Sequence, residues 1–152
     1  MILEEILKIE NIELDLKATE RTEAINYLID LLYKSKEISN KEEVVKAALK
    51  REEEFTTGVG LQVAIPHAKS PYVNTPSIAV GISKEGIEWP TEDGQNPRII
   101  FLIVVPEEAS DLHLRLLAEI ARKIIHDEVR KNILESINEQ GIINALKLEP
   151  ER

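Results

Sequence analysis

Three histidines are the side chains of this sequence best suited to chemistry, because the 152-residue chain contains no cysteine. The absence of cysteine excludes thiol nucleophiles, disulfides and cysteine-ligated metal sites. His67 is the first candidate, since it follows a short apolar run and Pro66, whose ring leaves the backbone little freedom. A neutral imidazole is a nucleophile at about pH 7. Its attack on a phosphoryl group would form a phosphohistidine, which can pass the group on.

The segment before His67 carries groups that suit a phosphoryl group. Arg51 offers positive charge, Thr57 a hydroxyl, and Gly58 a backbone N–H in a flexible turn. Phosphoryl transfer mainly requires positioning and such donors for the equatorial oxygens. The residue types alone leave simpler interpretations open. His67 could be a structural hydrogen-bonding group, Arg51 a solvated helix end, and Gly58 with Gly60 only a turn, because the third glycine of a dinucleotide-binding motif is missing.

His113 is the second candidate and lies in the first turn of a predicted helix if Ser110 is its N-cap. Helical spacing places His113 on one face with Leu116 and Ile120, so we expect it to point inward. A helix N-terminus disfavours a cationic imidazole and favours an anion. His113 is therefore predicted to be neutral and to hydrogen-bond a phosphate oxygen, or else to be a buried structural histidine. His126, at the other end of this helix, is predicted to be a structural or surface residue.

Two other kinds of site are weaker alternatives. His67 and His113 could bind zinc with a carboxylate such as Asp111, but the sequence has no HExxH, HxH or EF-hand pattern. A serine hydrolase is disfavoured because no GxSxG elbow occurs. We therefore expect neither a metal nor a cofactor.

Net charge and hydropathy exclude further classes of protein. A formal net charge of -9 argues against non-specific nucleic-acid binding, which needs a basic surface. The longest apolar run, 99–105, is too short for a membrane helix, which needs about 20 residues. The N-terminus carries Glu4 and Glu5 and does not resemble a signal peptide. We expect a cytoplasmic protein without membrane insertion, with residues 1–152 forming a single domain.

The elements that position these residues are predicted to be helices at both ends of the chain and short strands between them. Most prolines and glycines lie between residues 58 and 97, which favours strands and loops there. The run at 99–105 is typical of a strand buried on both faces, so we predict an α/β layered domain. Thr19 is the expected N-cap of the first helix, and Asn40 with Glu43 forms a capping-box pattern for the second. The predicted strands cover 63–65, 77–83, 85–89 and 98–105, and the later helices cover 111–126 (apolar stripe Leu112, Leu116, Leu117, Ile120, Ile124, Ile125), 128–136 and 140–146.

Two stretches of the sequence resemble a known family. The first comprises Arg51-Glu52, Thr57-Gly58, Gly60 and the Ala-Ile-Pro-His-Ala segment at 64–68. It resembles the signature of the fructose/mannitol-type enzyme IIA domain of the bacterial phosphoenolpyruvate-dependent sugar phosphotransferase system, which nitrogen-regulatory IIA proteins share. The second is a buried strand ending in a proline, a loop, and then His113 at the start of a helix. The likeness extends over about residues 5–147.

The resemblance implies roles for the candidate residues and a more detailed fold. It implies that His67 is phosphorylated, at Nε2, that His113 is the neighbouring active-site histidine, and that Arg51 helps to hold the phosphoryl group. It also implies a mixed sheet of four or five strands flanked by helices.

The resemblance further implies partners and two possible roles. Phosphocarrier HPr would donate the phosphoryl group, and a IIB component would accept it for sugar transport. Alternatively, phosphorylation would control binding to regulatory target proteins. Leu61 stands where family members often carry a small or amide residue, and this affects the choice of partner. Val59, Leu61 and Val63 are candidates for an apolar rim that contacts the partner.

Overall fold

The apolar run of the sequence forms the central strand β6 (Ile99–Pro106) of a computed structural model that describes residues 2–109 and 111–148. Every residue of β6 is buried. It pairs antiparallel with β5 (Ser77–Ile82) on one side, and parallel with β3 (Val63–Ala64) and β4 (His67–Ser70) on the other. Because side chains alternate along a strand, burial of both faces requires helices on both sides of the sheet.

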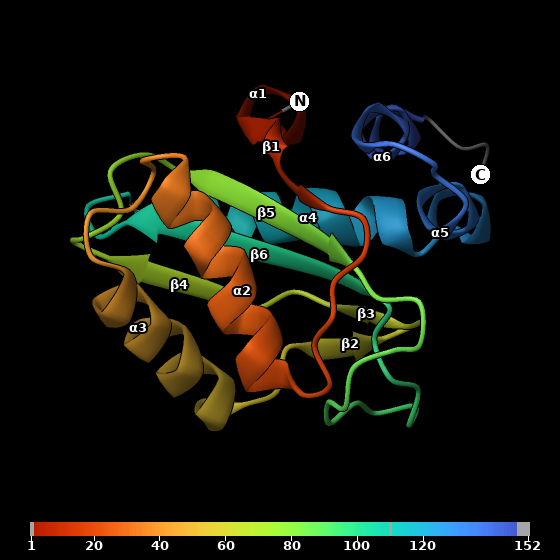
Figure 1. Ribbon diagram of the computed structural model, residues 1–152, viewed down its shortest axis with the longest axis horizontal. Helices are drawn as coiled ribbons and strands as arrows, with labels where there is room; N and C mark the ends of the chain where they lie inside the picture. The colour runs from red at the N-terminus through yellow and green to blue at the C-terminus, as the bar shows by residue number, and fades with distance from the viewer. Residues whose placement is uncertain (1, 110, 149–152) are drawn as a thin grey trace.

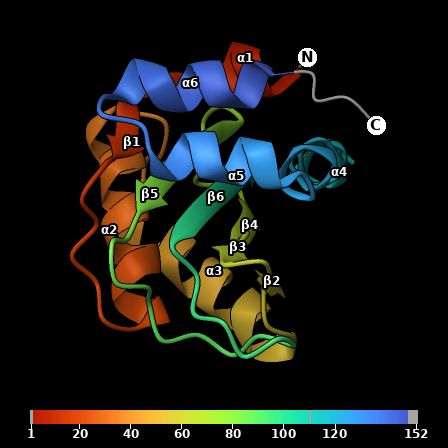
Figure 2. The same ribbon diagram turned by 90° about the vertical axis from the view of Figure 1, so that its right-hand side faces the viewer.

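The alternating residues of β6 belong to two separate hydrophobic cores. One set packs toward α1 (Ile2–Ile6), α4 (Leu112–Ile124), α5 (Asp127–Leu134) and α6 (Glu139–Lys147). The other packs toward α2 (Arg21–Lys34) and α3 (Lys41–Glu54). Figure 1 shows α2 and α3 in front of the sheet and α4 behind it, and Figure 2 shows the three layers edge-on. The first set is Ile99, Phe101, Ile103 and Val105, and the second is Ile100, Leu102 and Val104.

The sheet also contains β1 (Leu7–Glu13) and β2 (Gly58–Gly60), and its six strands lie in the order β1-β5-β6-β3-β2, with β4 beside β6. The predicted α/β layered sandwich with a mixed sheet is confirmed, with one strand more than the larger expected number. The unpredicted strands are β1, β2 and β4, which are short or rich in polar residues. Residues 58–60, predicted as a flexible turn, are extended because they pair with β3. The predicted strand at 85–89 is wrong: the segment turns at Gly86 (φ 90°) and makes only an isolated bridge from Glu88.

The two helices in front of the sheet begin close to the predicted positions. Asn40 caps α3 as expected, its Oδ1 accepting the Glu43 N–H at 3.2 Å. The predicted Thr19 cap of α2 is wrong by one residue, because the Glu20 carboxylate accepts the Glu23 N–H at 2.9 Å. The Thr19 hydroxyl instead donates to the Glu23 side chain. The helix α3 continues past Arg51 to Glu54, so that Arg51 occupies its last turn.

The helices behind the sheet also follow the predicted pattern. The proposed cap Ser110 lies outside the described residues, and Asp111 is the N-cap residue of α4, without a side-chain cap bond. The prediction that Ile125 belongs to the apolar stripe of α4 is wrong, since its side chain is 63% exposed. The helix ends at Ile124, and after it the chain turns toward α5. Among the helices of the described ranges, none has the length and apolar character needed to cross a membrane.

Candidate functional site

His67 opens the edge strand β4. Residues 63, 64, 67 and 68 pair with 99, 100, 103 and 104 of β6, so β3 and β4 run along β6 in one register. Pro66 interrupts this line, and its carbonyl accepts the Ile103 N–H at 3.0 Å. The sequence predicts a strand at 63–65 that Pro66 terminates before His67; in the structure that strand ends at Ala64, and His67 is the first residue of the next one. The backbone of His67 pairs with Ile103 of the buried strand β6. This pairing fixes the position of the imidazole.

The imidazole of His67 faces the helix that carries His113. Ala68, the next residue of β4, packs into the core beneath α2 and α3, and alternation therefore turns His67 toward the α4 layer. His113 stands in the first turn of α4, and the two ring centroids are 6.2 Å apart with an interplanar angle of 31°. The structure thus brings together the two histidines that the sequence predicted as partners.

A cavity of about 430 Å³ lies beside these two rings. Its walls come from the last two turns of α3, the start of β4 and the start of α4. Arg51 is among the lining residues, as predicted. The lining residues that sequence reasoning missed on α3 are spaced by three or four from one another, so helical periodicity around Arg51 could have found them. The full lining is Ala47, Lys50, Arg51, Glu54, His67, Ala68, Lys69 and His113.

The hydrogen bond of His67 assigns its tautomer. Nδ1 of His67 lies 3.0 Å from the carbonyl oxygen of Ile65. A carbonyl can only accept, so Nδ1 carries the proton of the neutral ring. Nε2 therefore holds the lone pair and is the nitrogen available for attack on an electrophile.

The surroundings of both histidines favour the neutral ring. Burial lowers the pKa of His67 below its ordinary value of 6.5, and the positive charge of Arg51, with that of His113 when it is protonated, lowers the pKa further. The hydrogen bond to Ile65 and the Glu52 carboxylate act against this lowering of the pKa. Burial also lowers the pKa of His113, with a contribution from the Lys69 charge. Both rings are thus predominantly uncharged at neutral pH.

The first turn of α4 is suited to an anion. The Nδ1 atom of His113 is buried and has no hydrogen-bond partner among the described residues. It lies at the N-terminus of a 13-residue helix, where backbone N–H groups and the helix dipole favour negative charge. Lys50, Arg51 and Lys69 gather at the same cavity, although the whole chain has a net charge of -9. The cavity therefore concentrates hydrogen-bond donors and positive charge.

Arg51 is held in place by the end of its own helix. Its Nη1 donates to the carbonyl oxygen of Phe55 at 2.7 Å, where α3 ends. This bond orients the guanidinium in the lining of the cavity and leaves its other N–H groups for an anion. The phosphoryl-holding role that the family resemblance implies for Arg51 stays a prediction.

Thr57 and Gly58 do not line this cavity. The N–H and hydroxyl of Thr57 both donate to the Glu52 carboxylate, and the Gly58 N–H donates to Thr56 Oγ1 at 3.1 Å. A Cβ at Gly58 would lie only 2.6 Å from the Pro90 carbonyl oxygen. In the described structure these two residues therefore serve other contacts than the phosphoryl contacts predicted for them.

The predicted apolar rim is divided between surface and core. Val59 is 51% exposed and Leu61 40% exposed, whereas Val63 is fully buried beside β6. Val63 thus belongs to the core, because β3 pairs with the central strand. Phe55 and Leu114 are also exposed. Phe55 follows the helix that carries Arg51, and Leu114 follows His113 in α4.

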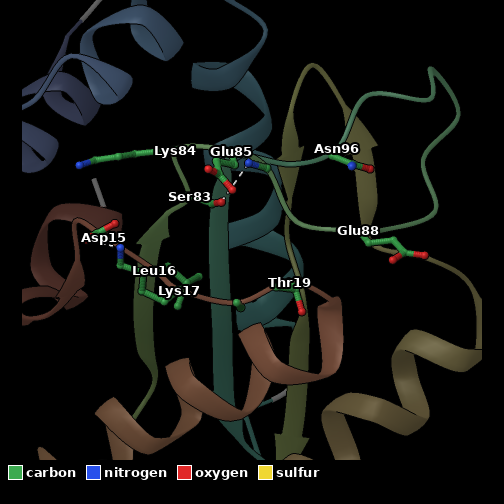
Figure 3. Close-up of a pocket in the computed structure, with 11 residues that line it drawn as sticks. Asp15, Leu16, Lys17, Thr19, Ser83, Lys84, Glu85, Glu88 and Asn96 are labelled. Atoms are coloured by element: carbon green, nitrogen blue, oxygen red, sulfur yellow. Dashed lines mark hydrogen bonds and ion pairs between the residues drawn. The ribbon is translucent and has the colours of Figure 1, made fainter.

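Other candidate sites lack comparable chemistry. A second cavity, of about 370 Å³, is formed by residues 15–19, 83–86, Glu88 and Asn96, and shares no lining residue with the His67 cavity (Figure 3). It contains no histidine. His126 lies between α4 and α5, away from the lining of either cavity. Within the described part of the chain, no group of three or more metal-binding side chains gathers.

Comparison with known proteins agrees with this geometry. Residues 5–148 match the family model described as "Phosphoenolpyruvate-dependent sugar phosphotransferase system, EIIA 2". The chain is 33% identical over 141 residues to the fructose-specific EIIA component of Haloferax volcanii, covering 93% of this chain and 92% of that protein. It is also 33% identical over 146 residues to the fructose-specific EIIABC component of Bacillus subtilis, covering 96% of this chain but only 23% of that longer protein.

A solved structure supports the same assignment. The nitrogen regulatory protein IIA-Ntr of Neisseria meningitidis superposes with a TM-score of 0.90 at 25% identity, covering 97% of this chain and all of that one. The match of the family model extends over nearly the whole described fold and includes both histidines and Arg51. The chain therefore belongs to the EIIA 2 family, the phosphotransferase components of the phosphoenolpyruvate-dependent sugar phosphotransferase system.

Proposed function

We propose that this chain carries a phosphoryl group on Nε2 of His67 and passes it to a IIB component. The observation that supports the proposal best is the hydrogen bond from His67 Nδ1 to the Ile65 carbonyl. It leaves the Nε2 lone pair free in a cavity that is rich in donors. Membership of the EIIA 2 family supplies the reaction class.

The donor in this proposal is the phosphohistidine of HPr. Nε2 of neutral His67 attacks phosphorus in line, the new N–P bond forms, and the donor's N–P bond breaks. The donor imidazole keeps the electron pair of the broken bond, and His67 keeps its proton on Nδ1. Arg51, His113 and the N-terminus of α4 stabilise the oxygens of the transferring group. The two proteins supply the positive charge, so no metal is required.

The second half of the cycle transfers the group from His67 to a IIB component. The Bacillus subtilis relative is named as an EIIABC component, which supports a IIB acceptor. Because two relatives are named as fructose-specific, a fructose-type IIB is the first acceptor to test. The match over residues 5–148 supports the prediction that residues 1–152 form a single EIIA domain. We propose that transfer takes place in the cytoplasm.

A regulatory role is the second candidate function. The likeness to IIA-Ntr, which extends over nearly the whole chain, favours it. In that role His67 would be phosphorylated by the same chemistry, and its phosphorylation would control binding to a target protein. The higher identity to two fructose-specific proteins favours the transport role over this one.

The test is reconstitution of the phosphoryl relay. The protein is incubated with phosphoenolpyruvate labelled in its phosphoryl group, enzyme I and HPr. A fructose-type IIB is then added to test whether the labelled phosphoryl group is passed on. We expect one acid-labile phosphate per chain, loss of uptake in His67→Ala, unchanged uptake in His126→Ala, and release of the label to IIB. Uptake by His67→Ala would contradict the carrier role of this residue. Uptake without release to IIB, together with a partner retained only by one phosphorylation state, would favour regulation.

A further inference from the structure

Glu52 is a buried carboxylate next to Arg51 in the last turn of α3. Only 3% of its surface is exposed. Its Oε2 accepts the Thr57 N–H at 2.8 Å and the Trp89 Nε1–H at 3.0 Å, and its Oε1 accepts the Thr57 hydroxyl. Arg21 approaches Oε2 at 3.4 Å. All these neighbours are donors, which matches an ionised carboxylate, a group that only accepts.

Thr57 connects this carboxylate to the segment that carries His67. The Thr57 carbonyl accepts the Ile65 N–H at 2.9 Å. The Ile65 carbonyl in turn accepts the Nδ1–H of His67 at 3.0 Å. Three hydrogen bonds, joined by the backbones of Thr57 and Ile65, therefore lead from Glu52 to the imidazole. The nitrogen at the end of this path is the one opposite the proposed nucleophile.

We propose that Glu52 is a positioning residue that holds Thr57 so that the Ile65 carbonyl keeps His67 in its Nδ1–H tautomer. Its importance for phosphoryl transfer rests on the proposed function of His67. Thr57 acts in the same path, which gives it a role in place of the direct phosphoryl contact predicted from the sequence. The shared occurrence of Arg51-Glu52 and Thr57-Gly58 in one motif then has a physical reason, since Glu52 and Thr57 bind each other.

The charge of Glu52 also matches the change in charge at His67. When Nε2 bonds phosphorus while Nδ1 keeps its proton, the ring carries positive charge. The Ile65 carbonyl accepts from this cation, and the hydrogen bond is stronger because its donor is charged. The negative charge of Glu52 favours a positively charged His67 ring, since it raises the pKa of that imidazole. Glu52 thus supports both the reactive tautomer and the phosphorylated ring.

The test compares Glu52→Gln with Glu53→Gln. The control variant loses the same charge from the same turn of α3, but at an exposed residue outside the cavity lining. Nitrogen-15 NMR of the imidazole measures the His67 tautomer and its pKa in the unphosphorylated protein. The rate of phosphoryl uptake from phosphorylated HPr is measured on the same samples.

We expect the Glu52→Gln variant to lose Nδ1–H tautomer and to titrate at a lower pH than the Glu53→Gln variant. Its phosphoryl uptake should be slower by about 10-fold to 100-fold, the effect typical of lost support for a reactive histidine. A folded Glu52→Gln protein with the wild-type tautomer, pKa and rate would overturn the proposal. A residue with only a structural role would change the melting temperature without changing the tautomer.

A second pair of variants decides the question if Glu52→Gln does not fold. Thr57→Val removes the hydroxyl contact to Glu52, and Thr57→Ser keeps it. We expect the Val variant to shift the tautomer and slow uptake, and the Ser variant to restore both. Equal behaviour of the two variants would overturn the proposal. Because tautomer and pKa are measured without phosphate, failure of wild-type uptake would refute the carrier function alone.

Discussion

The imidazole rings of His67 and His113 lie with their centroids 6.2 Å apart, although one residue belongs to an edge strand and the other to a helix. The pairing of β4 with β6 and the packing of α4 on the same strand bring them together. Each ring is partly withdrawn from solvent, and each therefore resists protonation. The lowered pKa of the two rings affects both the stability of the protein and the reactivity of His67.

The stability of the protein should depend on pH in the range in which ordinary histidines titrate. Because the folded-state pKa of His67 and His113 is lowered, the unfolded chain binds more protons below about pH 6.5. The contribution of the two histidines to the free energy of unfolding should be fully present above that pH. It should decrease as the pH falls toward about 5, before most carboxylates titrate. Urea unfolding across this range measures it. The double variant His67→Gln/His113→Gln should flatten the slope, whereas an unchanged slope in the double variant would contradict this origin.

Arg51→Lys should slow phosphoryl uptake while leaving the fold intact. The guanidinium presents several N–H groups in a planar fork, and an ammonium group cannot reproduce this geometry. We expect uptake from phosphorylated HPr to be slower by about 10-fold to 100-fold. The free energy of unfolding should change by less than about 1 kcal/mol, because the bond to the Phe55 carbonyl is exposed. Arg122→Lys, on the exposed side of α4, is the control, and equal rates in the two variants would show that Arg51 does not hold the phosphoryl group.

Gly58→Ala should act mainly on stability. The added Cβ would approach both the Pro90 carbonyl oxygen and the Thr91 methyl group to 2.6 Å. Relief requires movement of backbone, and we expect a loss of about 1–3 kcal/mol, as in other overpacked sites. Gly94→Ala meets no atom within 4 Å and should lose only about 1 kcal/mol from its positive φ. Normal stability of Gly58→Ala with slow phosphoryl uptake would instead support the direct role that the sequence predicted.

Gln62→Gly should stabilise the protein. Leu61 and Gln62 form the two-residue turn between β2 and β3, with φ values of 58° and 63°. Such a turn requires positive φ at both positions, which costs an ordinary residue about 1 kcal/mol and glycine very little. Chemical denaturation should show a gain of about 0.5–1 kcal/mol. Glu92→Gly, in an exposed loop without positive φ, should give no gain in the free energy of unfolding. A lower free energy of unfolding in Gln62→Gly would contradict the claim that Gln62 is strained.

The sequence predicts the elements that carry their own periodicity or apolar run. The strand β6, the capped helix α3 and the stripe of α4 are of this kind. The strands β1 and β4 could not be predicted in this way. The four residues of β4 include a histidine, a lysine and a serine, and they are extended because β6 offers an unpaired edge beside them. Pairing over a long distance in sequence leaves little local signal.

Within the site, the chemistry of single residues was predictable and the support between residues was not. His67, His113 and Arg51 were recognisable from residue type and motif, and the fold brings them to one cavity. Glu52 stands in a run of three glutamates that resembles a solvated helix end. Its burial beneath Trp89 and its bonds to Thr57 follow from the packing of a distant loop on α3. Sequence spacing could not distinguish it from exposed Glu53.

The most direct test of the central claim is to locate the phosphorus atom after uptake. The protein labelled with nitrogen-15 is phosphorylated by phosphoenolpyruvate, enzyme I and HPr, and coupling between phosphorus-31 and the imidazole nitrogens is measured by NMR. We expect phosphorus on Nε2 of His67, with the proton on Nδ1 still bonded to the Ile65 carbonyl. Phosphorus on Nδ1 of His67, or on another residue, would contradict the account.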